Sequence, residues 1–361
     1  MTPHEFASLV AALNEWRDAG CADGAALATL VRTRGSAFRR AGACMLVHGD
    51  GRVVRGLSAG CPDADIAAHA RDVIASGTAH LVRYDREHGY DLLLELGCGG
   101  ELEVLVEPLR SATDLAFVDA IGRCLRERRT VHLMSVFARD GECLPQPRRL
   151  VWCGGVEHDG LGDPQLTALL LARVEAVSHD AGARLQAIET GVGTFDAFVE
   201  RVLPPLRLVL VGPGLISSAL ARLAQALGWD VVLVDHREAP NEAPPAGVER
   251  VWAEPRHFAE RVAIDARTAV VVVTHNLERD VEYLHALPAG AGYVGALGSR
   301  GRADKLRRAL GARATGLHSP AGLDIGSETP EEIALAIASE IQAVTSGHGG
   351  GSLNASQGPI H

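Results

Sequence analysis

Hydrophobic positions in the first half of the chain follow both helical and strand spacing. Apolar residues three or four apart predict helices over 4–19, 63–76, 114–126 and 164–177. Shorter apolar runs predict strands, and Gly49-Asp50-Gly51 predicts a hairpin turn between two of them. These strands cover 26–33, 44–48, 53–56, 79–84, 91–95, 101–107, 130–137, 149–153 and 184–188. The mixture is typical of an α+β domain, and we see no internal repeat along the chain.

The pattern changes over 200–206, where the sequence ERVLPPL interrupts both spacings with two prolines. Beyond it, strands alternate strictly with helices, and the strand runs are apolar on both faces, which is typical of a parallel sheet. These runs cover 208–211, 231–234, 269–274 and 292–297. A final helix is predicted to begin at a capping sequence formed by Thr329, Pro330 and Glu332.

The fold class is therefore predicted to be α/β, with two domains in a chain of 361 residues. We expect an N-terminal α+β domain over 1–200 and a C-terminal Rossmann-like domain with a parallel sheet over 206–345. The tail over 346–361 is rich in Gly and Ser and has no periodicity, so we expect it to be disordered.

Composition and charge exclude several classes of function. The formal charge is −10, and no basic stripe with aromatic residues offsets it, so we expect no nucleic-acid partner. No apolar run reaches membrane-spanning length, and acidic residues interrupt the apolar pattern of the N-terminus, so we expect a cytoplasmic protein without membrane contact. The seven cysteines show no CxxC spacing and are expected to remain thiols.

A glycine-rich turn follows the first strand of the second half, in the sequence VLVGPGLISSAL. Gly212 and Gly214 permit a tight turn and a close backbone approach, and Ser217 is a third small residue that lets the following helix pack on the strand. Asp235 ends the next strand, where a carboxylate binds a ribose hydroxyl in dinucleotide-binding domains. The turn is predicted to hold a phosphate or NAD(P), unless its glycines serve the fold alone.

Two further loops follow predicted strands of the same sheet. Ser299 and Arg300 lie in the sequence GSRGR, where guanidinium groups suit a phosphate, and His275 lies in the sequence THN. The alternatives are a helix start with solvated arginines and a structural histidine. If ligand binding is correct, all three residues line the same edge as the glycine turn.

Loops of the N-terminal half carry arginine and cysteine side chains. Arg39 and Arg40 belong to a group of four arginines around Gly35, which favours an anionic ligand. Cys61 lies at a strand-to-helix turn, where the helix dipole favours a thiolate that is nucleophilic or binds metal. Glycines flank Cys98, so that a ligand can approach closely. The other cysteines are expected to be packing residues: Cys21, Cys44, Cys124, Cys143 and Cys153.

These motifs, in this order over about 26–345, resemble the XdhC/CoxI family of accessory proteins for xanthine and carbon monoxide dehydrogenases. The resemblance rests on RTRGSAFRRAGACMLV, GLSAGC, GCGG, GPGLISSALARLAQALGW, THN, YVGALGSRGR and HSPAGLDIGSETPEEIALAIASEI. It implies a maturation factor that binds molybdenum cofactor (molybdopterin), protects it while its terminal sulfur ligand is installed, and delivers it to a xanthine dehydrogenase-type molybdenum hydroxylase. Carried over residue by residue, Cys61, Cys98, Arg39 and Gly42 match family motif positions.

The resemblance also implies partners and leaves alternatives open. A cysteine desulfurase and a second copy of the chain are expected partners besides the hydroxylase. No Ser-His-Asp, paired-carboxylate or Lys-Tyr arrangement stands out at motif spacing, which favours a non-catalytic maturation factor. The alternatives are an NAD(P)-dependent oxidoreductase that uses the glycine turn and Asp235, and a scaffold that docks a hydroxylase or sulfurase without binding cofactor.

Overall fold

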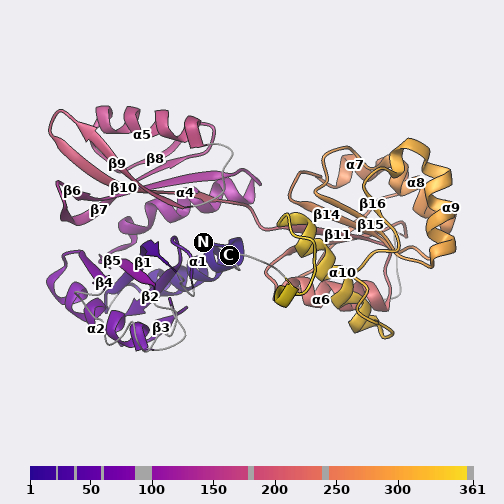
Figure 1. The fold of residues 1–361 in the computed structure, drawn as a ribbon, viewed down its shortest axis with the longest axis horizontal. Helices are drawn as coiled ribbons and strands as arrows, with labels where there is room; N and C mark the ends of the chain where they lie inside the picture. The colour runs from indigo at the N-terminus through magenta and orange to yellow at the C-terminus, as the bar shows by residue number, and fades with distance from the viewer. Residues whose placement is uncertain are drawn as a thin grey trace. The chain divides into compact units, whose positions relative to one another are not determined.

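A computed structural model describes residues 1–21, 23–35, 39–57, 61–85, 100–177, 183–237 and 244–355. Its residue contacts divide the chain into two compact units, Met1–Pro204 and Pro205–His361. The first unit is built on antiparallel sheets and the second on a parallel sheet, which confirms the predicted fold class (Figure 1). None of the helices in these described ranges is long and apolar enough to cross a membrane.

The first unit repeats one order of elements: a helix, three strands, a helix and two strands. In its first half these are α1 (Pro3–Asp18), β1 (Ala25–Arg34), β2 (Cys44–His48), β3 (Val53–Val54), α2 (Cys61–Ser76), β4 (His80–Tyr84) and β5 (Glu101–Leu109). In its second half, after the 3-10 turn η1 (Ala112–Leu115), they are α4 (Ala116–Arg126), β6 (Val131–Arg139), β7 (Glu142–Trp152), β8 (Val156–Asp159), α5 (Pro164–Val177), β9 (Arg184–Thr190) and β10 (Gly193–Val202).

The strand orders of the two antiparallel sheets match as well. They are β3-β2-β1-β5-β4 and β8-β7-β6-β10-β9, so each half places its first strand at the centre and its last two strands on the same side. The structure thus reveals a repeat of topology that the sequence does not show. Topology is repeated where the sequence is not, because the same strand pairings need only an apolar pattern and not the same residues.

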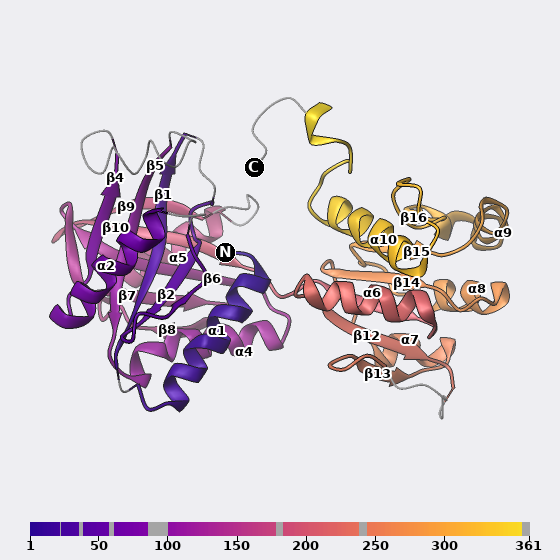
Figure 2. The ribbon, with the colours of Figure 1, turned by 90° about the horizontal axis from the view of Figure 1, so that it is seen from below.

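Both sheets of the first unit are covered on both faces. One cluster of buried side chains joins α1 and α4 to the inner faces of the two sheets. Separate clusters pack α2 on the first sheet and α5 on the second, and Figure 2 shows these helices beside their sheets. Burial on both faces explains why β2 and most of β1 and β6 are buried throughout and read as continuous apolar runs.

The helices predicted for the first unit are confirmed, as is the hairpin between β2 and β3. The sequence analysis missed β8 and β10, and it began β7 at Arg149 instead of Glu142. Pro145 and Pro147 hid the start of β7, which pairs irregularly with β6 near a register shift. The strand predicted over 91–95 lies outside the described residues.

Six parallel strands form the sheet of the second unit, in the order β13-β12-β11-β14-β15-β16. Their bounds are β11 (Arg207–Val211), β12 (Asp230–Asp235), β13 (Glu249–Trp252), β14 (Thr268–Val272), β15 (Tyr293–Ala296) and β16 (Leu317–His318). The four strands predicted from the sequence are the four central ones. The edge strands β13 and β16 are short and less apolar, and the sequence analysis missed both.

Helices cover both faces of this sheet. The helices α6 (Leu215–Ala226) and α10 (Pro330–Thr345) pack on one face, and α7 (Phe258–Arg261), α8 (Leu277–Ala286) and α9 (Arg300–Leu310) on the other. The capping box predicted at Thr329 and Glu332 is present at the start of α10. In the tail, a 3-10 turn η4 spans Leu353–Ala355, and residues 356–361 lie outside the described part.

Candidate functional site

The glycine turn joins β11 to α6. Gly212 adopts φ +107, and a Cβ at this position would lie 2.9 Å from the Cα and 3.0 Å from the N of Thr274. Both contacts are with backbone atoms just after the end of β14. Moving this backbone aside would cost free energy, because it is fixed by the strand. Glycine is therefore required at Gly212 for two reasons, its backbone conformation and the close approach of a neighbouring strand.

This turn lies where the strand order reverses. β11 has β12 on one side and β14 on the other, so the chain leaves the sheet centre in opposite directions on either side of this point. Ligands of open α/β sheets bind in the crevice that such a reversal leaves at the carboxyl ends of the strands. Gly214 caps α6 without a side chain, and Leu215 at the first helical position is 78% exposed. The first N–H groups of α6 therefore face outward as donors for an anion.

Ser217 lies inside the turn. Its side chain is buried, and its hydroxyl donates a hydrogen bond of 2.6 Å to the carbonyl oxygen of Gly212. The small side chain lets α6 approach β11, as the sequence predicted, and the hydroxyl also holds the turn closed. Its contact with a ligand remains a prediction.

Asp235 is the last residue of β12 and is buried. Its carboxylate accepts hydrogen bonds from the backbone N, Nε and Nη2 of Arg237 at 3.0, 3.2 and 3.2 Å. Burial raises the pKa of Asp235, but the hydrogen bonds and charge of Arg237 outweigh it and hold the pKa below its ordinary value. A ribose hydroxyl at Asp235 would have to share the carboxylate with Arg237.

His275 lies beside the glycine turn. It adopts φ +59, a left-handed conformation that is uncommon for residues other than glycine, and its Nε2 lies 3.7 Å from a Cβ built on Gly214. The next residue, Asn276, caps α8 by accepting a hydrogen bond of 3.1 Å from the N of Arg279. The structure therefore brings His275 and Gly214 together at the switch point.

Ser299 and Arg300 begin α9 at the same edge of the sheet. Ser299 caps the helix by accepting a hydrogen bond of 3.3 Å from the N of Arg302, and Arg300 is exposed. The guanidinium of Arg302 donates to Asp280 at 2.5 Å instead of facing outward. Arg300 is therefore the guanidinium of this loop that remains accessible to an anion.

The sequence analysis missed Asp280, which links the loops after β14 and β15. This carboxylate is 1% exposed, and it accepts hydrogen bonds from the hydroxyl and N of Thr274 as well as from Arg302. It lies on the buried side of α8 with Tyr283 and Leu284. A signal was present in the sequence, because an acidic residue three and four positions before apolar residues lies on the apolar side of a helix.

Three of the four arginines around Gly35 lie beside carboxylates. Arg32 lies 3.4 Å from Glu103 and Arg34 lies 3.6 Å from Glu101. Arg39 pairs with Glu5 of α1. These pairs reduce the excess positive charge expected from the sequence around Gly35.

Glu5 also lies 3.7 Å from Arg55, which adopts the left-handed φ +61. Burial raises the pKa of Glu5, but the hydrogen bond from the backbone N of Thr2 and the charge of Arg39 outweigh it, so the pKa lies below 4.5. The carboxylate therefore stays ionised and holds the Arg39 loop against α1. Arg40 is exposed.

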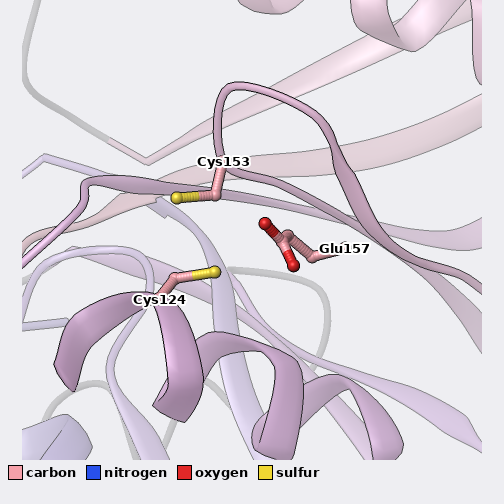
Figure 3. Close-up of side chains that lie close together, drawn as sticks. All are labelled: Cys124, Cys153 and Glu157. Atoms are coloured by element: carbon pink, nitrogen blue, oxygen red, sulfur yellow. The ribbon is translucent and has the colours of Figure 1, made fainter. Parts of the chain in front are cut away.

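Of the two cysteines singled out from the sequence, one lies in the described part of the chain. Cys61 is the first residue of α2, as a strand-to-helix turn requires, and Cys98 lies outside the described residues. Of the cysteines expected to be packing residues, Cys44, Cys124 and Cys153 are buried, and Cys21 and Cys143 are partly buried. Cys124 and Cys153 also come together with Glu157, a grouping that their sequence spacing does not indicate (Figure 3).

These features define a chain with a repeated antiparallel unit and a Rossmann-type unit whose glycine turn lies at the switch point of its sheet. The family model described as "XdhC and CoxI family" matches residues 19–85, and the model described as "XdhC Rossmann domain" matches residues 208–341. A probable xanthine dehydrogenase subunit from Bacillus subtilis (strain 168) is 31% identical over 333 residues, which cover 88% of this chain and 92% of that protein. The chain belongs to the XdhC and CoxI family.

Two other similar proteins extend over most of the chain. The molybdenum cofactor insertion chaperone PaoD from Escherichia coli (strain K12) is 28% identical over 89% of this chain and 83% of its own length. The crystal structure of a xanthine dehydrogenase from Bacillus halodurans matches with a TM-score of 0.71 at 26% identity, covering 99% of this chain and 98% of that one. The similarity is therefore not confined to the Rossmann-type unit.

Proposed function

We propose that this protein is an accessory chaperone that binds molybdenum cofactor and assists its sulfuration and insertion into a xanthine dehydrogenase-type molybdenum hydroxylase. The observation that carries the proposal is the glycine turn at the switch point, a geometry that suits an anion, in a chain whose relatives include a named cofactor insertion chaperone. Molybdopterin is an anion with a terminal phosphate, so its chemistry fits such a site.

Residues around the turn suit the phosphate. The N–H groups at the start of α6 and the exposed guanidinium of Arg300 are the donors in this proposal, and His275 beside Gly214 is a third. Ser217 supports the turn from beneath through its bond to Gly212. When bound, the cofactor supplies a molybdenum ion held by a dithiolene, and the chain supplies the groups that hold and orient it.

The proposal also assigns cysteine and arginine residues of the first unit to cofactor binding. Cys61 begins α2, and the positive end of a helix favours the thiolate that soft metal or sulfur chemistry requires. Cys98 and the exposed Arg40 are the other groups assigned to the cofactor, and Arg39 holds the arginine loop against α1 through Glu5. Sulfuration in this scheme uses a cysteine desulfurase as the sulfur donor, and the chain works as a homodimer.

To test this, the chain is co-expressed with the proteins of cofactor biosynthesis and purified. Bound molybdenum is measured by mass spectrometry, and bound pterin by fluorescence after oxidation. Leu215→Asp places a negative charge at the exposed start of α6, where it stabilises the helix but repels a phosphate. We expect it to reduce occupancy about tenfold or more. Leu215→Asn has the same shape without the charge and is the matched control.

A second pair of variants tests the arginine. Arg300→Ala is expected to lower occupancy, whereas Arg308→Ala, an exposed arginine in the last turn of the same helix, is not. A wild-type chain that carries neither molybdenum nor pterin refutes cofactor binding. In that case, client maturation that persists with Cys61→Ala supports a scaffold that docks its partners without cofactor.

An NAD(P)-dependent oxidoreductase is the second candidate, and the position of Asp235 at the end of β12 favours it. Arg237 weighs against it, because this side chain already occupies the Asp235 carboxylate. Calorimetric titration with nicotinamide nucleotides tests this candidate. Absence of binding, or binding that Asp235→Asn leaves unchanged, removes it.

A further inference from the structure

A second candidate site lies in the first unit and uses none of the residues assigned above. Cys124 belongs to α4, Cys153 follows β7, and Glu157 lies on β8 (Figure 3). Their sulfur atoms and a carboxylate oxygen all lie within 4.8 Å of one another. In Figure 3 the Cys124 sulfur points toward the Glu157 carboxylate, and the Cys153 sulfur lies above Cys124 and points to the side away from Glu157. We propose that these three side chains form a binding site for a zinc ion.

Local backbone structure fixes two of the three groups. Cys153 and Glu157 flank the turn between β7 and β8, in which the N of Cys153 donates a hydrogen bond of 2.8 Å to the carbonyl oxygen of Gly155. Gly154 adopts φ +72, a conformation that favours glycine. The tight turn brings the Glu157 carboxylate back over Cys153, and α4 supplies the second thiol from the opposite side.

The spacing is close to that of a tetrahedral thiolate site. Zinc binds sulfur at about 2.3 Å and carboxylate oxygen at about 2.1 Å, so its ligand atoms lie about 3.5 to 4 Å apart. The observed upper limit of 4.8 Å requires each side chain to move by roughly 1 Å or less. Three protein ligands leave one position for water, the pattern of zinc sites with an open coordination position.

Burial and charge also suit a metal ion. Cys124 and Cys153 are buried, whereas the Glu157 side chain is 25% exposed and gives the site an opening. Displacement of the thiol protons by zinc produces the thiolates that coordinate it, and the protons leave to solvent.

Arg129 supplies the remaining charge. Its Nη2 donates to Glu157 Oε1 at 2.9 Å and to Cys124 Sγ at 3.7 Å, and its Nη1 donates to the carbonyl oxygen of Cys153 at 2.7 Å. Two thiolates and one carboxylate carry three negative charges; Zn²⁺ supplies two positive charges, and Arg129, which also pairs with Glu127 at 2.8 Å, supplies a third. Donors directed at metal ligands are a usual outer layer of such sites.

The test uses the full-length chain with Cys61→Ser and Cys98→Ser, so that thiols of the loops contribute nothing. The reduced, chelator-treated protein is titrated with Co²⁺ as a spectroscopic probe and then with Zn²⁺. We expect one cobalt per chain, a thiolate-to-cobalt charge-transfer band with tetrahedral d–d bands, and loss of both as zinc displaces cobalt.

Single variants then assign the ligands. Cys153→Ser is expected to weaken the charge-transfer band and lower affinity about tenfold or more, and Cys124→Ser to do the same. Glu157→Gln keeps the band but lowers affinity, and it carries the test if a buried cysteine variant fails to fold. Cys143→Ser changes a partly buried cysteine of β7 outside the group and is expected to have no effect.

Three results overturn the proposal. One is a titration without a charge-transfer band, and another is a band that survives both Cys124→Ser and Cys153→Ser. The third is a disulfide between Cys124 and Cys153, formed by oxidised glutathione in a chain that binds no metal.

Discussion

The substitution Gly212→Ala isolates the contact on which the switch point depends. Alanine at φ +107 adopts a conformation that costs about 1 to 2 kcal/mol. Its Cβ would also lie 2.9 and 3.0 Å from backbone atoms of Thr274, closer than real Cβ contacts. Moving the end of β14 aside adds about 1 to 2 kcal/mol by analogy with overpacked cores. We therefore expect a local destabilisation of about 3 kcal/mol.

Hydrogen exchange of the full-length chain measures this effect where it arises. Amide protection in β11 and α6 reports the free energy of opening the second unit. A loss of about 3 kcal/mol accelerates exchange there by roughly a hundredfold, since 1.4 kcal/mol corresponds to a factor of ten. Peptides from β1 and β6 serve as internal references, because they belong to the first unit.

Gly316→Ala is the matched control. Gly316 has the left-handed φ +78, but a Cβ built there meets nothing within 4 Å. It therefore carries the conformational cost without the contact and should lose only about 1 kcal/mol. If Gly212→Ala destabilises the second unit no more than Gly316→Ala, the close approach of Thr274 is not what makes Gly212 necessary.

Three further predictions concern polar groups described above. Asp280→Asn breaks a buried ion pair with Arg302 and should cost about 2 to 3 kcal/mol of stability in denaturant titrations. Ser217→Ala removes the hydrogen bond to Gly212 and should cost about 1 kcal/mol in the same assay. Because the pKa of Glu5 is lowered in the folded chain, its contribution is present above pH 4.5 and is lost as the pH falls through the folded pKa. The stability difference between wild type and Glu5→Gln should therefore shrink as the pH falls below about 4.5.

Each of these predictions has a result that contradicts it. An Asp280→Asn chain within about 0.5 kcal/mol of wild type would mean that the ion pair contributes nothing net. Ser217→Ala as stable as wild type would show that the turn closes without the hydroxyl. A stability difference for Glu5→Gln that stays constant with pH would mean that Glu5 has an ordinary pKa.

Much of the second unit follows from the sequence alone. Apolar runs without polar alternation specify strands buried on both faces, and such strands occur in parallel sheets covered by helices. Gly212 and Gly214 mark the turn at the first strand, and Thr329 with Glu332 marks the start of α10. These signals are local, because backbone conformation and capping depend on residues a few positions apart.

Local sequence patterns did not predict every strand or the strand orders of the first unit. β10 was missed because the prolines that follow it made its end look like a linker and because its buried residues do not alternate, since Ala197 through Glu200 are all buried. The strand orders were not predictable, because alternation tells which face a side chain takes and not which strand lies beside it. Only the pairing of β1 with β5 and of β6 with β10 makes the repeat visible.

Side-chain groupings in space depended entirely on the tertiary structure. Asp280 meets Arg302 because α8 and α9 pack on the same face of the sheet. Cys124 meets Cys153 because α4 packs against the hairpin of β7 and β8, although nothing in their spacing relates them. Residues close together in the sequence thus determined most of the turns, helix caps and strands of this protein. Tertiary packing decided which polar and thiol side chains meet, because those contacts join residues that are far apart in the sequence.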